Sequence, residues 1–144
     1  MFQNYSFDGF NVIHIDWILP FQNETFQSYA FRISENMNDE NAILIGLSFG
    51  GMLSVEISKI KRFKKIFLLS SAKTKSEIPF YYKVLGKLNL LEIIPVSFLK
   101  SVNFLTYLVF GAKTNSEKNL LKDSVKNTES SFMKWALHQI INWK

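Results

Sequence analysis

The sequence predicts an α/β fold: a parallel β-α-β-α-β core followed by a mostly helical segment. Short apolar runs rich in β-branched residues alternate with helix-like stretches between residues 12 and 70. Such alternation is typical of parallel sheets with right-handed crossovers. Beyond Pro79, helical patterns replace the strands, with interruptions at Pro95 and Gly111.

The first half of the core is expected between residues 12 and 41. Apolar and β-branched residues dominate Val12–Trp17, and Pro20 follows, which predicts a strand. A helix is expected at Glu24–Asn36, where apolar and aromatic residues recur three and four positions apart. The polar residues 38–41 are the loop before the next strand.

The second half of the core contains the most regular patterns. Ile43–Gly46 is a continuous apolar run, typical of a parallel strand buried on both faces. The following helix, Phe49–Ile60, is apolar nearly all round, which indicates a central position. A third strand is expected at Ile66–Ser70. The predicted division places the α/β core in residues 1–78 and a helical cap or lid in residues 79–144.

A G-x-S-x-G motif, Gly46-Leu47-Ser48-Phe49-Gly50, joins the second strand to the helix after it. Between a strand and a helix, this motif forms a sharp turn that holds its serine in a strained conformation, with the hydroxyl above the sheet edge. Glycines are expected at 46 and 50, and with them Gly51, because side chains would clash across so sharp a turn. The alternative is a serine N-cap on an ordinary strand-to-helix loop.

This turn resembles the nucleophile elbow of the α/β-hydrolase superfamily, and the strands and helices around it extend the resemblance. Residues 80–143 are similar to the helical cap that many members insert after the third strand. The resemblance implies that Ser48 is the nucleophile and that the backbone N–H of Phe49 is one oxyanion donor. It implies a small-molecule acyl ester or thioester as substrate, an acyl-Ser48 intermediate, and no cofactor.

The rest of the family's catalytic machinery is not evident. The triad runs Ser, Asp or Glu, then His along the chain, and the sequence after Ser48 offers Asp123 and His138. Both fall in helical patterns, whereas the family carries its acid and histidine in loops after late strands. Asp123 and His138 are therefore weak candidates, better read as a solvated helix face and a helix-surface histidine. No His-Gly loop precedes Ser48, so the chain is interpreted as the middle of a hydrolase, cut at both ends.

A few other residues have the chemistry for a role. His14 and Asp16 are two apart on the expected first strand, so their side chains would share a face; strand-end polar residues are the simpler interpretation. Glu77 stands where some related enzymes carry their acid, although loop solubility explains it better. The aromatic residues of the predicted cap are expected either to line an acyl pocket or to form the cap's own core. They are Phe80, Tyr81, Tyr82, Phe98, Phe104, Tyr107 and Phe110.

Composition narrows the classes of partner and compartment. The net charge is +5. The densest basic cluster, Lys59–Lys65, comes at the end of the central helix. A solvated helix end explains this cluster better than a nucleic-acid-binding patch does. There is no cysteine and no signal-peptide pattern, which fits a cytoplasmic location. Charged and polar residues and a proline interrupt the apolar stretch Leu88–Phe110, so no membrane span is expected. His14 and His138 lack partners at metal-ligand spacing.

Two other functions remain open at this point. One is a non-catalytic hydrolase-like module that binds a partner or a hydrophobic ligand, and the other is an acyltransferase with the same nucleophile.

Self-association is also expected. If the outer strands of the family's sheet are missing, the apolar edges of the remaining strands would be exposed, and such edges favour association.

Overall fold

The computed structural model describes residues 7–80 and 114–144. Backbone contacts group these residues into two compact units, one with residues 7–19 and 114–133, the other with residues 20–80 and 134–144. The sequence did not predict that residues 134–144 would group with residues 20–80. Whether residues 79–144 as a whole form a cap stays a prediction, because residues 81–113 lie outside the described part.

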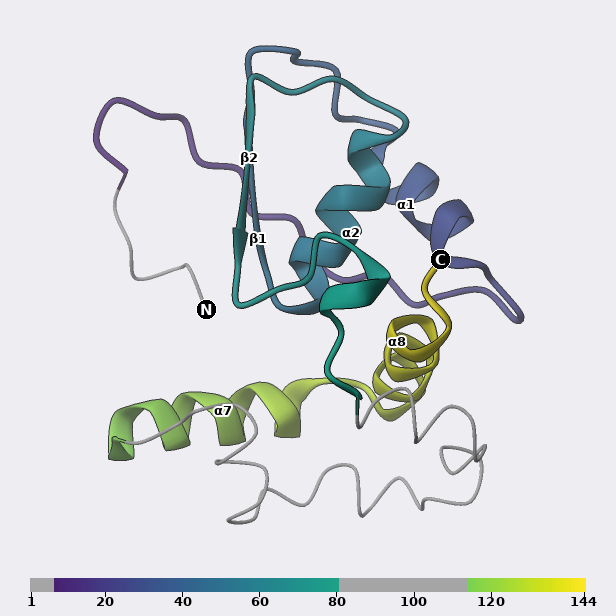
Figure 1. Ribbon diagram of the computed structural model, residues 1–144. Coiled ribbons are helices and arrows are strands. Elements are labelled where there is room, and N and C mark those ends of the chain that lie inside the picture. Colours follow the sequence, from purple (N-terminus) through teal and green to yellow (C-terminus); the bar gives the residue numbers. More distant parts are fainter. Residues whose placement is uncertain (1–6, 81–113) are drawn as a thin grey trace. The chain divides into compact units, whose positions relative to one another are not determined.

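The larger unit contains the predicted β-α-β arrangement. Along the chain it has α1 (Phe26–Ser34), β1 (Ile43–Leu47), α2 (Phe49–Ser58), β2 (Lys65–Leu69) and a short 3₁₀ turn, η2 (Lys75–Glu77). The two strands pair in parallel, side by side in Figure 1, with Ile43 opposite Lys65 and Leu47 opposite Leu69. The expected mixed α/β class is confirmed, and each of the two strands and two helices lies within two residues of its predicted bounds.

The strand expected at Val12–Trp17 does not form, so this prediction is wrong. Residues 10–21 have no regular secondary structure, and the sheet of the described residues has two strands, β1 and β2. A strand is stable only when neighbours pair with its backbone, and β propensity alone does not supply that partner. The inference that His14 and Asp16 share a strand face is wrong for the same reason.

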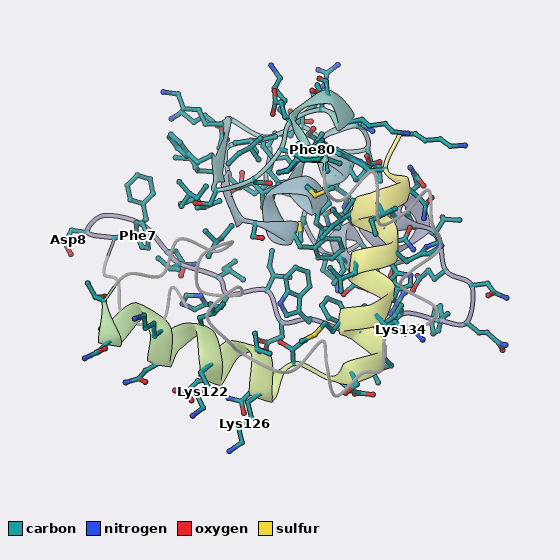
Figure 2. All side chains as sticks on the ribbon, turned by 60° about the horizontal axis from the view of Figure 1, so that its bottom comes forward. Phe7, Asp8, Phe80, Lys122, Lys126 and Lys134 are labelled. Carbon is teal, nitrogen blue, oxygen red and sulfur yellow. The ribbon has the colours of Figure 1, made fainter. Side chains whose placement is uncertain are left out.

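The smaller unit is built around α7 (Asn115–Asn127) and the beginning of α8 (Ser130–Asn142). Both helices lie where the sequence has helical patterns. The ring of Trp17 packs on Phe132, with centroids 5.0 Å apart. Lys122 and Lys126 are exposed one turn apart, and Figure 2 shows both projecting from the same side of α7. This helix therefore presents a charged face to solvent.

Helix α2 is the centre of the larger unit. It contacts α1 and both strands, and Met52, Leu53 and Ile57 are buried. A helix that is apolar nearly all round needs neighbours on several sides, as the sequence predicts. The turn that begins α2 is therefore fixed by the core of this unit.

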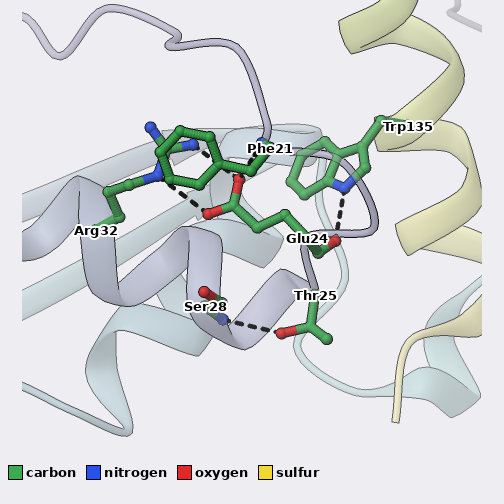
Figure 3. Close-up of polar contacts among 6 residues, drawn as sticks. All are labelled: Phe21, Glu24, Thr25, Ser28, Arg32 and Trp135. Atoms are coloured by element: carbon green, nitrogen blue, oxygen red, sulfur yellow. Dashed lines mark hydrogen bonds and ion pairs between the residues drawn. The ribbon is translucent and has the colours of Figure 1, made fainter.

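One buried acid organises the start of α1 (Figure 3). Glu24 accepts two hydrogen bonds from Arg32, at 3.0 and 2.7 Å, and a third from Phe21 N–H at 2.8 Å. The Arg32 guanidinium also lies over the Phe21 ring, 4.1 Å from its centroid. Thr25 Oγ1 caps the helix by accepting from Ser28 N–H at 3.1 Å. Burial alone raises the pKa of Glu24, but the hydrogen bonds from Arg32 and Phe21 outweigh it and lower that pKa.

We expect this pair to make stability depend on pH. A carboxyl whose pKa is lower in the folded chain contributes stability above its unfolded pKa of about 4.3 and loses it as pH falls through the folded value. Glu24→Gln is expected to destabilise by about 2 kcal/mol at pH 7, the size of a buried charge-assisted hydrogen bond. Urea unfolding from pH 7 to pH 3 measures the difference between the two proteins, which should shrink with acidification. A difference independent of pH would contradict the ionic role of Glu24.

Two tryptophans attach the last residues to this core. The Trp135 ring contacts three other aromatic rings, and the distances between ring centroids are 4.5 Å to Tyr29, 6.3 Å to Phe26 and 5.9 Å to Phe49. The Trp135 Nε1–H also donates a hydrogen bond to the Glu24 carbonyl at 2.8 Å. Trp143 Nε1–H donates to the buried Glu56 carboxylate at 2.6 Å. Residues 134–144 are thus part of the packing around α1 and α2.

One face of the small sheet is apolar and open. Leu44 and Gly46, on one face of β1, are buried. On the opposite face of the sheet, Ile45 of β1 and Phe67 and Leu69 of β2 are 36%, 47% and 41% exposed. Ile45 and Phe67 are directly opposite each other in the register. Among the described residues each strand also has one unpaired edge. Apolar faces and free edges of this kind favour association.

We therefore expect the chain to self-associate through this face. Size-exclusion chromatography with light scattering should give a mass that rises with concentration, and Phe67→Ser should shift it toward the monomer. Phe31→Ser is the matched control, because Phe31 is 55% exposed on α1 and outside the sheet face. A wild-type chain that stays monomeric over a hundredfold concentration range would contradict the expectation.

Candidate active site

Ser48 lies in the sharp turn between β1 and α2. Its backbone has φ 51° and ψ −121°, and its side chain is exposed. The Ser48 N–H donates to the Leu69 carbonyl at 2.9 Å, so the parallel pairing with β2 continues to the serine itself. A positive φ combined with this ψ is a sparsely populated backbone conformation that costs a non-glycine residue about 1–3 kcal/mol, which the surrounding packing offsets. The strained backbone predicted for Ser48 is therefore confirmed.

Two glycines make the turn possible. A Cβ at Gly46 would meet the Gly50 carbonyl oxygen, Ser54 Oγ and Gly51 Cα, the last at 2.6 Å. A Cβ at Gly51 would meet the side chain of Ser71. The Gly50 carbonyl also accepts from Ser54 Oγ at 2.8 Å. The expectation that a side chain at position 46 would clash across the turn is confirmed.

Three donors hold the Ser48 carbonyl. It accepts from Gly51 N–H at 2.9 Å and Met52 N–H at 3.3 Å, both in the first turn of α2, and from the hydroxyl of Ser71 at 2.7 Å. The C=O and N–H of a trans peptide point in opposite directions. The Phe49 N–H belongs to the same peptide group as the Ser48 carbonyl. It therefore points out of the N-terminal end of α2, opposite to the direction of that carbonyl.

The Phe49 ring is held from two sides. It stacks on Phe26 with centroids 5.0 Å apart and an interplanar angle of 18°, and it meets Trp135 edge-on at 5.9 Å. Such ring pairs contribute about 0.5–1.5 kcal/mol each beyond their area burial. The residue after Ser48 is thus fixed at both its backbone and its side chain.

The strand beside the turn ends in the same unusual way. Ser70, directly after β2, has φ 46°, so each of the two parallel strands is followed by a serine with positive φ. The strand predicted at Ile66–Ser70 ends one residue earlier than expected, and the positive φ of Ser70 was not predicted. A serine carries no sequence signal for positive φ, unlike glycine or asparagine.

The weak triad candidates are not connected to Ser48 by any described hydrogen bond. His138 is exposed on α8, where its carbonyl accepts from Asn142 Nδ2 at 3.0 Å. Asp123 is exposed on α7, in the other compact unit. Glu77 Oε2 accepts from Lys73 N–H at 2.7 Å and closes the loop after β2. Within the described ranges the turn therefore supplies a serine and backbone donors without a hydrogen-bonded base.

The remaining candidates lie elsewhere or outside the described part. A hollow of about 340 Å³ lies beyond the C-terminal end of α2, at the opposite end of that helix from Ser48, and is lined by Met37, Asn38, Glu40, Ile60, Lys61 and Arg62. The aromatic residues expected in an acyl pocket fall among residues 81–113, except Phe80, which is exposed. Residues 7–80 and 114–144 contain no group of three or more histidines or acids that would hold a metal ion.

Comparisons with known proteins found no protein similar to this chain. A scan against protein-family models, a search of curated proteins and a search of solved structures each gave no match. In the part of the chain with described structure, the helices are too short or too polar to cross a membrane.

Proposed function

We propose that this chain is a serine hydrolase of the α/β-hydrolase type, which cleaves carboxylic esters or thioesters through an acyl-Ser48 intermediate. The observation that carries the proposal is the backbone of Ser48, with φ 51° and ψ −121°, in a G-x-S-x-G turn between a parallel strand and a helix. An ordinary serine N-cap has extended backbone and its hydroxyl accepts from the helix, whereas Ser48 makes no such capping bond.

Each group of the turn has a role in this chemistry. Ser48 Oγ attacks the acyl carbonyl while a base takes its proton, and the alcohol or thiol leaves with a proton; water then hydrolyses the acyl-serine. The developing oxyanion is stabilised by the Phe49 N–H and by the positive end of the α2 dipole. None of the groups hydrogen-bonded within this turn is the base. The base is supplied by another part of the protein or by a partner chain.

A fluorophosphonate probe tests the nucleophile directly. We expect slow but specific labelling, with the modified peptide containing Ser48 and no labelling in Ser48→Ala. Ser58→Ala is the matched control, because Ser58 lies at the far end of the same helix and its hydroxyl donates to the Val55 carbonyl at 2.7 Å. Labelling that persists in Ser48→Ala would contradict the proposal.

We also expect poor turnover of short p-nitrophenyl esters by this chain. In the described residues no histidine or carboxylate is hydrogen-bonded to Ser48. A serine site without such a base keeps its oxyanion and binding contributions and loses about 10³-fold or more in rate. The release of nitrophenol, followed by absorbance and compared with Ser48→Ala at the same concentration, measures the rate that depends on the serine. Robust turnover lost in both Ser48→Ala and His138→Ala would contradict this expectation and make His138 the base.

A non-catalytic hydrolase-like module is the second candidate. It is favoured by the lack of a histidine or carboxylate hydrogen-bonded to Ser48 in the described ranges. This candidate predicts no fluorophosphonate adduct at Ser48. An acyltransferase with the same nucleophile predicts the adduct, and it is separated from a hydrolase by transfer of the acyl group to an added alcohol or amine.

A further inference from the structure

Ser71 connects the candidate nucleophile turn to the end of the neighbouring strand. Its hydroxyl donates to the Ser48 carbonyl at 2.7 Å. Its Oγ and Cβ fill the space where a side chain at position 51 would lie. One residue of the loop after β2 therefore contacts both the serine and the first turn of α2.

The bond from Ser71 acts on a single peptide group. The Ser48 carbonyl already accepts from Gly51 and Met52, at 2.9 and 3.3 Å, and these two bonds come from one direction, the helix. The third donor reaches the same oxygen from the adjacent strand end. Two donors on one side and one on another fix the rotation of the peptide plane, and with it the direction of the Phe49 N–H. Hydrogen bonds to a carbonyl also polarise the peptide and strengthen its N–H as a donor.

We propose that Ser71 is a positioning residue of the nucleophile turn: its hydroxyl fixes the Ser48–Phe49 peptide so that the Phe49 N–H points toward the oxyanion. This inference rests on the proposed function, because it gives Ser71 a part in the same acyl-transfer site. Ser71 itself touches no reacting atom.

The backbone before Ser71 supports this role. Ser70 has φ 46° although it is not glycine, and it is the last residue before Ser71. A left-handed residue changes the direction of the chain after β2. The strained residue stands where the chain turns to bring the Ser71 hydroxyl onto the Ser48 carbonyl, which is the arrangement expected when a constrained loop serves to orient a neighbour.

Two measurements on the full chain test the inference. The first is the amide resonance of Phe49 in ¹H–¹⁵N spectra, which should shift in Ser71→Ala and stay in place in the control Ser58→Ala. The second is the kinetics of fluorophosphonate labelling at Ser48. Ser71→Ala should lower the maximal labelling rate about 3- to 10-fold, the size of one neutral hydrogen bond, with the concentration for half-maximal rate unchanged. Ser71→Thr, which keeps a hydroxyl, should recover part of the rate.

The outcomes separate the inference from the proposed function. If wild type is labelled at Ser48 and Ser71→Ala reacts as fast as Ser58→Ala, the proposed function stands and the positioning role of Ser71 is overturned. If wild type is not labelled at Ser48, the proposed function fails, and the Phe49 resonance alone decides whether Ser71 orients this peptide. An unshifted Phe49 resonance in Ser71→Ala overturns the inference in either case.

Discussion

Gly46→Ala is expected to destabilise the protein by about 3 kcal/mol or more, at the upper end of the cost of overpacking. The added methyl would lie against the Gly50 carbonyl oxygen and within 2.6 Å of Gly51 Cα. Both are backbone atoms of the turn and the helix after it, so no side-chain rotation relieves the clash. The free energy of unfolding in urea, compared with that of wild type, measures the effect.

Gly9→Ala is the control for this substitution. Gly9 has φ +81°, but a Cβ there meets nothing within 4 Å. Its cost is the backbone strain of a left-handed alanine alone, about 1–2 kcal/mol. Equal destabilisation by the two substitutions would mean that the close approach at Gly46 is not what fixes the turn.

Trp135→Ala is expected to cost about 3–5 kcal/mol, as removal of a large aromatic side chain from a packed site does. The indole contacts the rings of Phe26, Tyr29 and Phe49, and its N–H satisfies the Glu24 carbonyl. The loss would loosen α1 against α2 and free one side of the Phe49 ring. We expect the melting temperature and the fluorophosphonate labelling of Ser48 to fall together.

Trp135→Phe separates packing from hydrogen bonding. It keeps most of the ring contacts and removes the N–H donor, so a loss of about 1 kcal/mol is expected. If Trp135→Ala left stability unchanged, residues 134–144 would not belong to the core of the larger unit. The grouping of α8 with α1 and α2 would then be wrong.

Local patterns in the sequence predict the sharp turn at Ser48 well. An apolar run, two closely spaced glycines and an apolar helix follow one another without a break, and each pattern acts over a few residues. The strained backbone of Ser48 follows from those neighbours, so its positive φ is predictable. The close approach at Gly46 follows from the same geometry.

Features that depend on distant partners are not predictable in this way. Val12–Trp17 has the composition of a strand, but strand formation depends on pairing with another segment, which composition does not reveal. The amphipathic pattern around Trp135 indicates a helix without saying which other helices it packs on. Ser71 belongs to no recognisable motif, and its contact with Gly51 depends on how the loop after β2 folds back onto α2.

The two tryptophans near the end of the described chain also determine when the larger unit can fold. Trp135 bonds to Glu24 across 111 positions, and Trp143 bonds to Glu56 across 87. Contacts this distant in sequence tend to form late, because the entropy of closing a long loop opposes them. During synthesis, residues 20–80 leave the ribosome well before residues 134–144.

At about 5–20 residues per second, the stretch from residue 80 to residue 134 takes roughly 3–11 seconds to synthesise. For that time the rings of Phe26, Tyr29 and Phe49 lack the indole that covers them in the folded chain. Until α8 has been synthesised, the nascent chain thus exposes an aromatic surface of the kind that chaperones bind.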